Sequence, residues 1–343
     1  MSLQQKKKKE RRIYILEIIK LKRLRVLGKI ILNLIVFFFI FSNVSFCLGD
    51  EIVSPKSLED GNVYSVNPTT YIRTGAGKDN VIQGLALDEK SNALYTLHVT
   101  GKPEMGTLNR FKINQKSTIS TDAIQLPSGF IGHQGISVDP SSGDIYASGG
   151  TSIKNKGWYV VRFCFSENEK PKKIFIIKTF GDGYKKTTSS MPVLTPDGKN
   201  LLVRGNKNNI NVIRIFNMKI LKSNISDIST SFIDEWNISK DLTNNHYDLQ
   251  AITTDGKRVF ILSGGENSLP KRLFIYDMKG NLIQRLDNIT LGFTQARLSG
   301  TEAHWEPEGI SYMNSSKSLL VAFAIGDFKA RQAIVFIIPL IKQ

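Results

Sequence analysis

The chain has 343 residues, of which 41% are apolar and 22% charged, a composition that excludes a disordered or collagen-like protein. The formal net charge is +16, but residues 1–29 contribute +9 of it, so the charge gives no reason to expect a nucleic-acid partner. Two cysteines, Cys47 and Cys164, are too few for a multi-bridge disulfide scaffold or a cysteine-rich zinc site.

Residues 1–49 resemble a basic n-region followed by a hydrophobic signal peptide or anchor. Residues 6–12 are almost wholly charged, and residues 30–41 are apolar apart from Asn33. This run is shorter than the ~20 residues of a membrane span, so we expect cleavage after Gly49, with an uncleaved anchor as the alternative. Both alternatives predict a secreted or cell-surface protein that contacts a membrane only through this segment.

Five copies of one pattern occupy the second predicted region, residues 50–343. Each copy contains two short apolar runs around a turn, as in a β-hairpin. The copies begin at Gln83-Gly-Leu-Ala-Leu-Asp, Gln134-Gly-Ile-Ser-Val-Asp, Met191-Pro-Val-Leu-Thr-Pro, Gln250-Ala-Ile-Thr-Thr-Asp and Glu308-Gly-Ile-Ser-Tyr-Met. Successive copies are 51, 57, 59 and 58 residues apart, so the repeating unit is a small sheet rather than a short solenoid repeat.

Two further strands are expected after each hairpin, except in the last copy, which has room for only one. Residues 63–73 stand before the first copy with strand-like content and no blade of their own. We therefore predict an all-β fold, a five-bladed β-propeller in which residues 63–73 pair with residues 333–338 and close the last blade.

Candidate binding residues lie immediately before or at the start of the innermost strand of a copy. In a propeller these positions converge at one mouth of the central channel, although they are far apart in sequence. Trp305, with Tyr247, is expected to stack on sugar rings, while carboxylates and amides bind hydroxyl groups. The candidates are His133, Gln134, His246, Asp248, Gln250, His304, Trp305, Glu306 and Glu308. The alternative is that these side chains only cap strands and satisfy polar groups in the channel.

No catalytic residue is assigned, because the sequence has no nucleophile elbow, phosphate loop or calcium loop. His304-x-Glu306-x-Glu308 places three side chains on one face of an extended segment, where they can do acid/base work or hold a metal. No cofactor is expected, with a divalent metal left open.

The pattern of Gln83-Gly-Leu-Ala-Leu-Asp, Leu108-Asn-Arg-Phe and Gly132-His133 resembles the propeller domain of TagC-like teichoic acid proteins and some phage receptor-binding proteins. His304-x-Glu306-x-Glu308 and Gln250-Ala-Ile-Thr-Thr-Asp are similar to helveticin J-like bacteriocins. These resemblances imply an exported, non-catalytic propeller that binds cell-wall polymer or another surface glycan, and we expect a monomer. The third copy departs from the pattern, with Ser190-Met-Pro192 in place of a polar residue and glycine.

Two alternative functions remain open at this point. Glu306-Pro-Glu-Gly-Ile310 is similar to turns of phytase-like and SMP-30-like propellers, which implies a metal-dependent hydrolase with Asp79, Asp248 and Glu308 as the best-placed acidic groups. The bacteriocin resemblance implies a toxin-like interaction protein instead.

Overall fold

The computed structural model describes residues 53–55, 62–67, 82–113, 118–221, 225–244, 247–266, 271–298, 304–325 and 332–342. At 53–55, 62–67, 118–121, 295, 332 and 341–342 only the backbone is described. Residues 54–341 form one compact unit. The predicted signal or anchor at 1–49, the candidate residue His246 and residues 68–73 lie outside the described residues. No described helix is long and apolar enough to cross a membrane.

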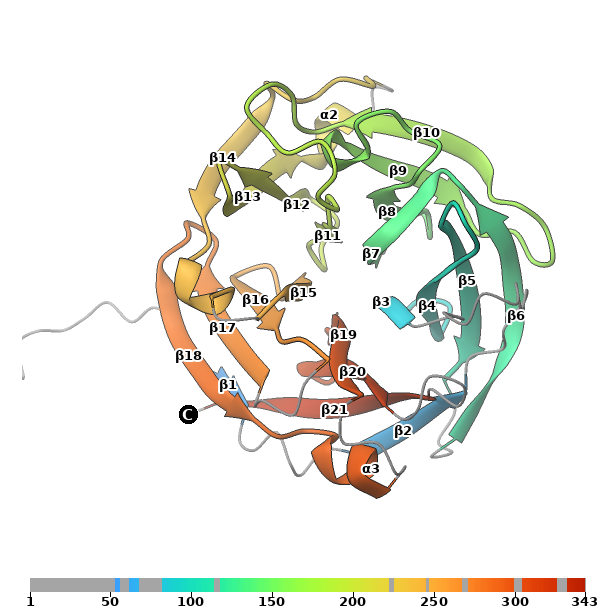
Figure 1. Cartoon of the computed structure of the whole chain (residues 1–343), viewed down its shortest axis with the longest axis vertical. Helices are drawn as coiled ribbons and strands as arrows, with labels where there is room; N and C mark the ends of the chain where they lie inside the picture. The colour runs from blue at the N-terminus through green and yellow to red at the C-terminus, as the bar shows by residue number, and fades with distance from the viewer. Residues whose placement is uncertain are drawn as a thin grey trace, which may run out of the picture. The chain divides into compact units, whose positions relative to one another are not determined.

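The described strands form five antiparallel four-stranded blades around a central axis (Figure 1). Blade 1 comprises β3 (Ile82–Asp88), β4 (Ala93–Thr100), β5 (Met105–Lys112) and β6 (Thr118–Ser128). Blade 2 comprises β7 (Ile131–Val138), β8 (Ile145–Gly149), β9 (Tyr159–Cys164) and β10 (Lys172–Lys178). Blade 3 comprises β11 (Pro192–Leu194), β12 (Asn200–Lys207), β13 (Ile210–Asn217) and β14 (Phe232–Asn237).

Blade 4 comprises β15 (Leu249–Thr254), β16 (Arg258–Ser263), β17 (Lys271–Asp277) and β18 (Leu282–Ile289). Blade 5 comprises β19 (Trp305–Met313), β20 (Ser318–Ile325), β21 (Gln332–Lys342) and, from the N-terminal side of the repeats, β2 (Asn62–Asn67). The short strand β1 (Val53–Pro55) also pairs with β21. Between the described strands lie four short helical turns: η1 (Lys156–Trp158), α2 (Met218–Leu221), η2 (Lys240–Leu242) and α3 (Phe293–Leu298).

The ring of blades is closed by β2, as the sequence predicts. β2 runs antiparallel to β21, with Val63 opposite Phe336 and Val66 opposite Ala333. On its other side it pairs in parallel with β6 of blade 1, with Val66 opposite Ile119. This second pairing is not predicted by the sequence, and it joins the sheets of blades 5 and 1 into one. The closure therefore covers the outer edges of two blades at once.

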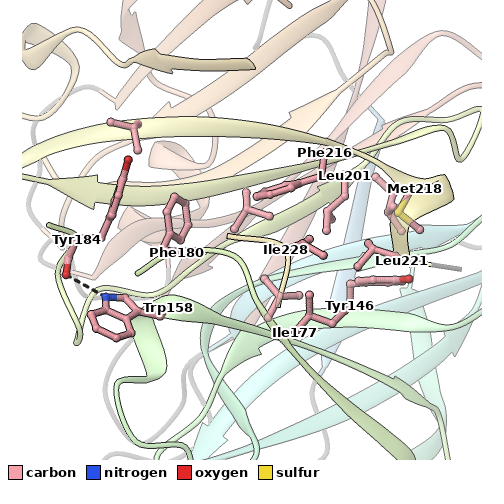
Figure 2. Close-up of a cluster of buried hydrophobic side chains, with 14 residues drawn as sticks. Tyr146, Trp158, Ile177, Phe180, Tyr184, Leu201, Phe216, Met218, Leu221 and Ile228 are labelled. Carbon is pink, nitrogen blue, oxygen red and sulfur yellow. Dashed lines mark hydrogen bonds between the residues drawn. The ribbon is translucent and has the colours of Figure 1, made fainter. Parts of the chain in front are cut away.

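Apolar side chains from neighbouring blades interlock to form the core. Figure 2 shows one such cluster between blades 2 and 3, to which Tyr146, Ile177, Leu201 and Phe216 contribute buried side chains. The alternation of residues along each strand places such side chains on both faces of a blade, because each blade is packed on both sides. The cores thus fix the angle between blades and hold the five inner strands parallel around the channel.

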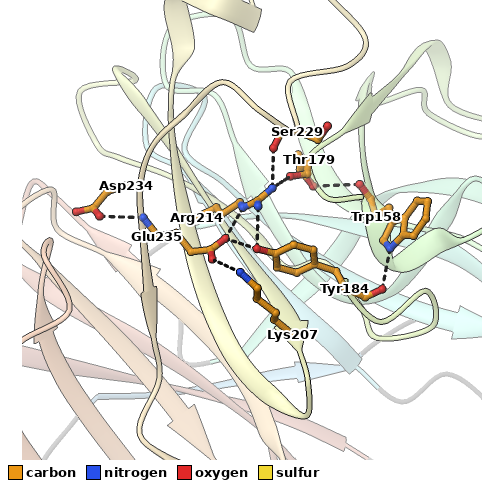
Figure 3. A network of polar contacts seen from close by, with 8 residues as sticks. All are labelled: Trp158, Thr179, Tyr184, Lys207, Arg214, Ser229, Asp234 and Glu235. Carbon is orange, nitrogen blue, oxygen red and sulfur yellow. Dashed lines mark hydrogen bonds and ion pairs between the residues drawn. The ribbon is translucent and has the colours of Figure 1, made fainter. Parts of the chain in front are cut away.

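A polar network fastens the segment between blades 2 and 3 to blade 3 (Figure 3). Arg214 donates from Nε to Glu235 Oε2 at 2.6 Å and from Nη2 to the Tyr184 hydroxyl oxygen at 2.8 Å. Burial alone would raise the pKa of Glu235, but hydrogen bonds from Tyr184 and Arg214 hold this pKa below its usual value. The same guanidinium donates to the carbonyl oxygens of Thr179 and Ser229. These contacts join Thr179 and Tyr184, in the segment between β10 and β11, to Arg214 of β13. The network therefore has a structural role.

Candidate functional site: the two ends of the central channel

The innermost strands β3, β7, β11, β15 and β19 all start at the same end of the channel, here called the proximal mouth. The first residue of each repeat lies there: Gln83, Gln134, Met191, Gln250 and Glu308. In all but blade 3 the strand pairing shifts register at this residue, between Ile82 and Gly84, Ile131 and Ile136, Leu249 and Ala251, and Pro307 and Gly309. A β-bulge re-aims its side chain, so the repeated Gln or Glu can leave the plane of its sheet.

Hydrogen bonds between these side chains cross the channel. Gln134 Nε2 donates to Gln250 Oε1 at 2.5 Å, which joins blade 2 to blade 4. Gln250 Nε2 donates to Glu306 Oε1 at 2.8 Å, and Gln83 Nε2 donates to Glu308 Oε1 at 3.3 Å. Gln83, Gln250 and Glu308 are at most 6% exposed. The first residues of the five repeats, Gln83, Gln134, Met191, Gln250 and Glu308, form what we call the polar ring, and Glu306 accepts a hydrogen bond from it.

The glycine that follows the ring residue allows neighbouring inner strands to approach each other. A Cβ atom at Gly309 would lie 2.7 Å from Cβ of Leu85 in blade 1. At Gly135, where φ is +87°, it would lie 2.7 Å from Cα of Met191 in blade 3. Contacts this close do not occur between real side chains, so the Gln-Gly and Glu-Gly pairs combine a channel-facing side chain with a close blade contact.

A buried lysine lies beside the ring. Lys271 is fully buried and donates from Nζ to the carbonyl oxygen of Gly265 at 2.7 Å. Its Nζ is 4.3 Å from the centre of the Trp305 ring, an arrangement that favours a cation. Burial nevertheless lowers the pKa of Lys271 to about 8, although the nearby charge of Glu306 opposes this shift.

A second buried cation, Arg204 of blade 3, lies at the same end of the channel as Lys271. Arg204 is 9% exposed and donates to Asn211 Oδ1 and to the carbonyl oxygen of Ser189. Burial lowers the pKa of Arg204 to about 10, partly offset by the charge of Asp248. Asp248 itself is exposed, so the proximal mouth presents an accessible carboxylate above buried positive charge.

Two histidines belong to this mouth. His133 and His304 are half-buried and lie at the starts of blades 2 and 5. Burial and the charge of Lys156 lower the pKa of His133, against the opposing charge of Glu104, so its imidazole is neutral at pH 7. The structure therefore places His133, Gln134, Asp248, Gln250, His304, Glu306 and Glu308 at one end of the channel. A ligand-binding role for them stays a prediction.

The predicted role of Trp305 is wrong. Its side chain is 1% exposed and packs between Phe293 of α3 and Phe323 of β20. Its indole Nε1 donates to the carbonyl oxygen of Leu291 at 2.8 Å. Tyr247 is also buried, with the guanidinium carbon of Arg272 3.6 Å from its ring centre. Neither ring offers a free face to a sugar, because neighbouring side chains cover each of them.

The opposite end of the channel, where the inner strands end, contains a pocket of about 270 Å³ that we call the distal pocket. Every inner strand lines it. The residues two positions after the polar ring form its aliphatic floor: Leu85, Ile136, Val193, Ile252 and Ile310. None of the polar-ring residues lines the distal pocket.

Hydroxyl groups form the wall of the distal pocket. Ser311 Oγ of blade 5 accepts from the Leu87 backbone N–H of blade 1 at 3.2 Å, and Ser137 Oγ of blade 2 accepts from the Leu194 N–H of blade 3 at 3.0 Å. These serines satisfy backbone groups at the free edge of the next inner strand. The aligned copies do show a hydroxyl residue here in blades 2, 4 and 5, the signal by which the pocket could have been found.

Metal ligands do not gather at either end among the described residues, where no three His, Cys, Asp or Glu side chains are grouped to hold an ion. Asp79 and His246 lie outside the described residues. The hydrolase reading, which needs such a group, stays a prediction.

A family model described as a phage 5-bladed β-propeller receptor-binding platform domain matches residues 81–336. No curated protein is significantly similar to the chain. Among solved structures, the tail fiber of Staphylococcus aureus phage P68 is similar with a TM-score of 0.58 and 18% identity. The similarity covers 88% of this chain and 56% of the tail-fiber chain, so this chain spans little more than half of that protein.

Two enzymes of similar fold are more distant. Glutaminyl cyclase of Myxococcus xanthus gives a TM-score of 0.46 at 12% identity, over 80% of this chain and 98% of the enzyme. The periplasmic gluconolactonase of Pseudomonas aeruginosa gives a TM-score of 0.38 at 11% identity, over 71% of this chain and 65% of the enzyme. These similarities concern the fold and carry no information on activity.

Proposed function

The chain belongs to the family of phage 5-bladed β-propeller receptor-binding platform domains, and on that premise we propose that it binds a glycan or wall polymer on a cell surface through its proximal mouth. The observation that carries the proposal is the family match over residues 81–336, which spans all five innermost strands. Teichoic acid is one polymer of this class, as the resemblance to TagC-like proteins implies.

The chemistry of the proximal mouth supports a hydroxyl-rich ligand. Asp248 is exposed and Glu306 is half-buried, so two carboxylates from adjacent blades can accept hydrogen bonds from sugar hydroxyls. Neutral His133 can donate or accept. The hydrogen bond from Gln134 of blade 2 to Gln250 of blade 4 spans the channel, so we expect a polymer to lie across the mouth rather than thread through it. With Trp305 and Tyr247 buried, recognition rests on hydrogen bonds rather than on aromatic stacking.

The test is an array of bacterial surface polysaccharides and wall polymers probed with the purified protein. We expect binding to a subset of these polymers, and we expect the double variant Asp248→Asn and Glu306→Gln to lose at least about tenfold in affinity, since each substitution weakens a charge-assisted hydrogen bond. Glu167→Gln is a matched control, because Glu167 is an exposed carboxylate on the outer part of blade 2. Its binding should equal that of the parent.

Two outcomes would contradict the proposal. An array on which no polymer is bound would favour a protein receptor or a different function. Full binding by the double variant would place the receptor site elsewhere on the propeller.

A further inference from the structure

We propose that the distal pocket is a second binding site, for one neutral hydroxyl-rich molecule of monosaccharide size. The site is independent of the proximal mouth, and the proposal does not rest on the receptor-binding function. It follows from the shape of the pocket, from the position of charge around it and from the hydroxyl groups on its wall.

The distal ends of all five inner strands surround the pocket. Leu85 of the aliphatic floor is three positions from Asp88 at the end of β3, or about 10 Å of extended strand. The volume of about 270 Å³ lies just below the range of pockets that hold drug-sized ligands. A single sugar ring therefore suits it better than an oligosaccharide.

The charged residues that line the pocket lie at its rim, where they already make hydrogen bonds to other parts of the chain. Glu89 accepts at 2.8 Å from the backbone N–H groups of Asn314 and Ser315. Asp88 accepts from the backbone N–H of Lys90 at 3.0 Å, and Lys90 Nζ donates to the carbonyl oxygen of Ser141. Below the rim the lining is uncharged. A charged ligand would lose its hydration there without gaining a counter-charge, which disfavours it against a neutral one.

The wall offers hydroxyls with remaining hydrogen-bonding capacity. The oxygens of Ser137 and Ser311 accept backbone N–H groups, which leaves their protons to be donated. Within the described part of the chain, the hydroxyls of Thr253 and Tyr312 make no hydrogen bond. Burial raises the pKa of Tyr312, with a smaller contribution from Asp255, so its phenol stays protonated and can donate at neutral pH. Four groups on three blades can thus surround one small polar molecule, with the aliphatic floor against its apolar face.

The experiment compares three probes of one ring size that differ in charge: methyl β-D-glucopyranoside, glucuronate and glucosamine. Ligand-observed saturation-transfer NMR on the full chain should detect the neutral glycoside with a dissociation constant on the order of 1–10 mM, and neither charged sugar. Thr253→Val with Tyr312→Phe should weaken glycoside binding about tenfold, because two hydroxyl partners are lost while side-chain volume is kept.

The double variant Asp248→Asn and Glu306→Gln is the control, because it alters the proximal mouth and should leave glycoside binding unchanged. Glycoside binding that falls with this control but survives Thr253→Val with Tyr312→Phe would place the sugar at the proximal mouth and overturn the proposal. Equal binding of glucuronate or glucosamine would refute the selection for a neutral ligand. No saturation transfer to methyl β-D-glucopyranoside at all would mean that the pocket holds only water.

Discussion

The two ends of the channel are built from the same five strands, yet they differ in where they keep charge. At the proximal mouth Lys271 and Arg204 are buried, and a chain of amide and carboxylate groups crosses the axis. At the distal pocket Glu89 and Lys90 remain on the rim, and the interior presents aliphatic groups and hydroxyls. The difference shows that one repeat can supply two chemistries: a bulge directs a polar side chain inward at its start, and regular strand geometry places aliphatic and hydroxyl residues after it.

Both ends exist only while the ring of blades is closed, so removal of β2 should have the largest effect. A chain that starts at residue 75 lacks the strand that pairs with both β21 and β6, which leaves two sheet edges uncovered. We expect aggregation or loss of the cooperative melting transition, measured by calorimetry and light scattering. A chain that starts at residue 50 keeps β2 and should melt like the parent. Equal melting of the two truncated chains would show that β2 does not hold the ring together.

The buried charge of Lys271 at the proximal mouth predicts a stability that rises with pH in the alkaline range. The pKa of Lys271 falls from 10.5 to about 8 on folding, so below pH 8 the folded state bears the full cost of burying an ammonium group. As pH rises from 8 to 10.5 the unfolded chain holds more protons than the folded chain, and stability contributed by this site increases by about 2–3 kcal/mol.

Denaturant melts of the parent and of Lys271→Met across this pH range measure the effect as a difference between the two proteins. The variant should be the more stable at pH 7, and its advantage should shrink towards pH 10.5. Lys219→Met, which removes an exposed lysine, should show no such trend. A constant difference between the parent and Lys271→Met would mean that Lys271 does not bear a buried charge.

The contact between blades behind the polar ring should tolerate no added carbon. Gly309→Ala would place Cβ 2.7 Å from Cβ of Leu85, so the inner strands of blades 5 and 1 must separate at a cost of about 1–3 kcal/mol. Gly181→Ala, whose new Cβ would have only Lys178 Cε within 4 Å, should change the free energy of unfolding by less than about 0.5 kcal/mol. Similar unfolding free energies for the two variants would argue against a close approach of the blades at Gly309.

The smallest effect is expected at the distal pocket. Thr253→Val and Tyr312→Phe remove hydroxyls that make no hydrogen bond within the described structure, so each should alter the free energy of unfolding by less than about 0.5 kcal/mol. Denaturant melts check this directly. A loss of more than about 1 kcal/mol would reveal a structural role for these hydroxyls and remove the reason to assign them to a ligand.

Much of the fold can be predicted from the sequence because the repeat is long and each copy has its own turn chemistry. The five-bladed propeller and the pairing of residues 63–66 with residues 333–336 follow from counting strands in each copy. The parallel pairing of β2 with β6 could not be predicted in this way, because it depends on how blades 5 and 1 meet in space. The meeting of Gln134 and Gln250 across the channel follows from their equivalent positions.

Which side chains of the site are buried is harder to predict from the sequence than where these residues lie in the fold. An aromatic residue at the start of an inner strand can face the channel or pack inside the propeller. Trp305 packs inside because it contacts Phe293 of α3 and donates to the Leu291 carbonyl oxygen. Neither partner has a counterpart in the other copies of the repeat. A lysine at a strand start is usually exposed, but the chain at Gly265 and the Trp305 ring cover Lys271. The aligned hydroxyl residues of blades 2, 4 and 5 are a sequence signal at the distal pocket, but the pocket itself depends on contacts between blades.

The most direct test of receptor binding at the proximal mouth is hydrogen–deuterium exchange of the full chain, with and without the surface polymer that it binds best on the array. Binding at the proximal mouth should slow exchange in residues 131–135 and 304–308, and leave the turns at 88–92 and 313–317 on the distal face unchanged. Protection confined to those turns, or to the outer strands β10, β14 and β18, would contradict the assignment of the receptor site to the proximal mouth.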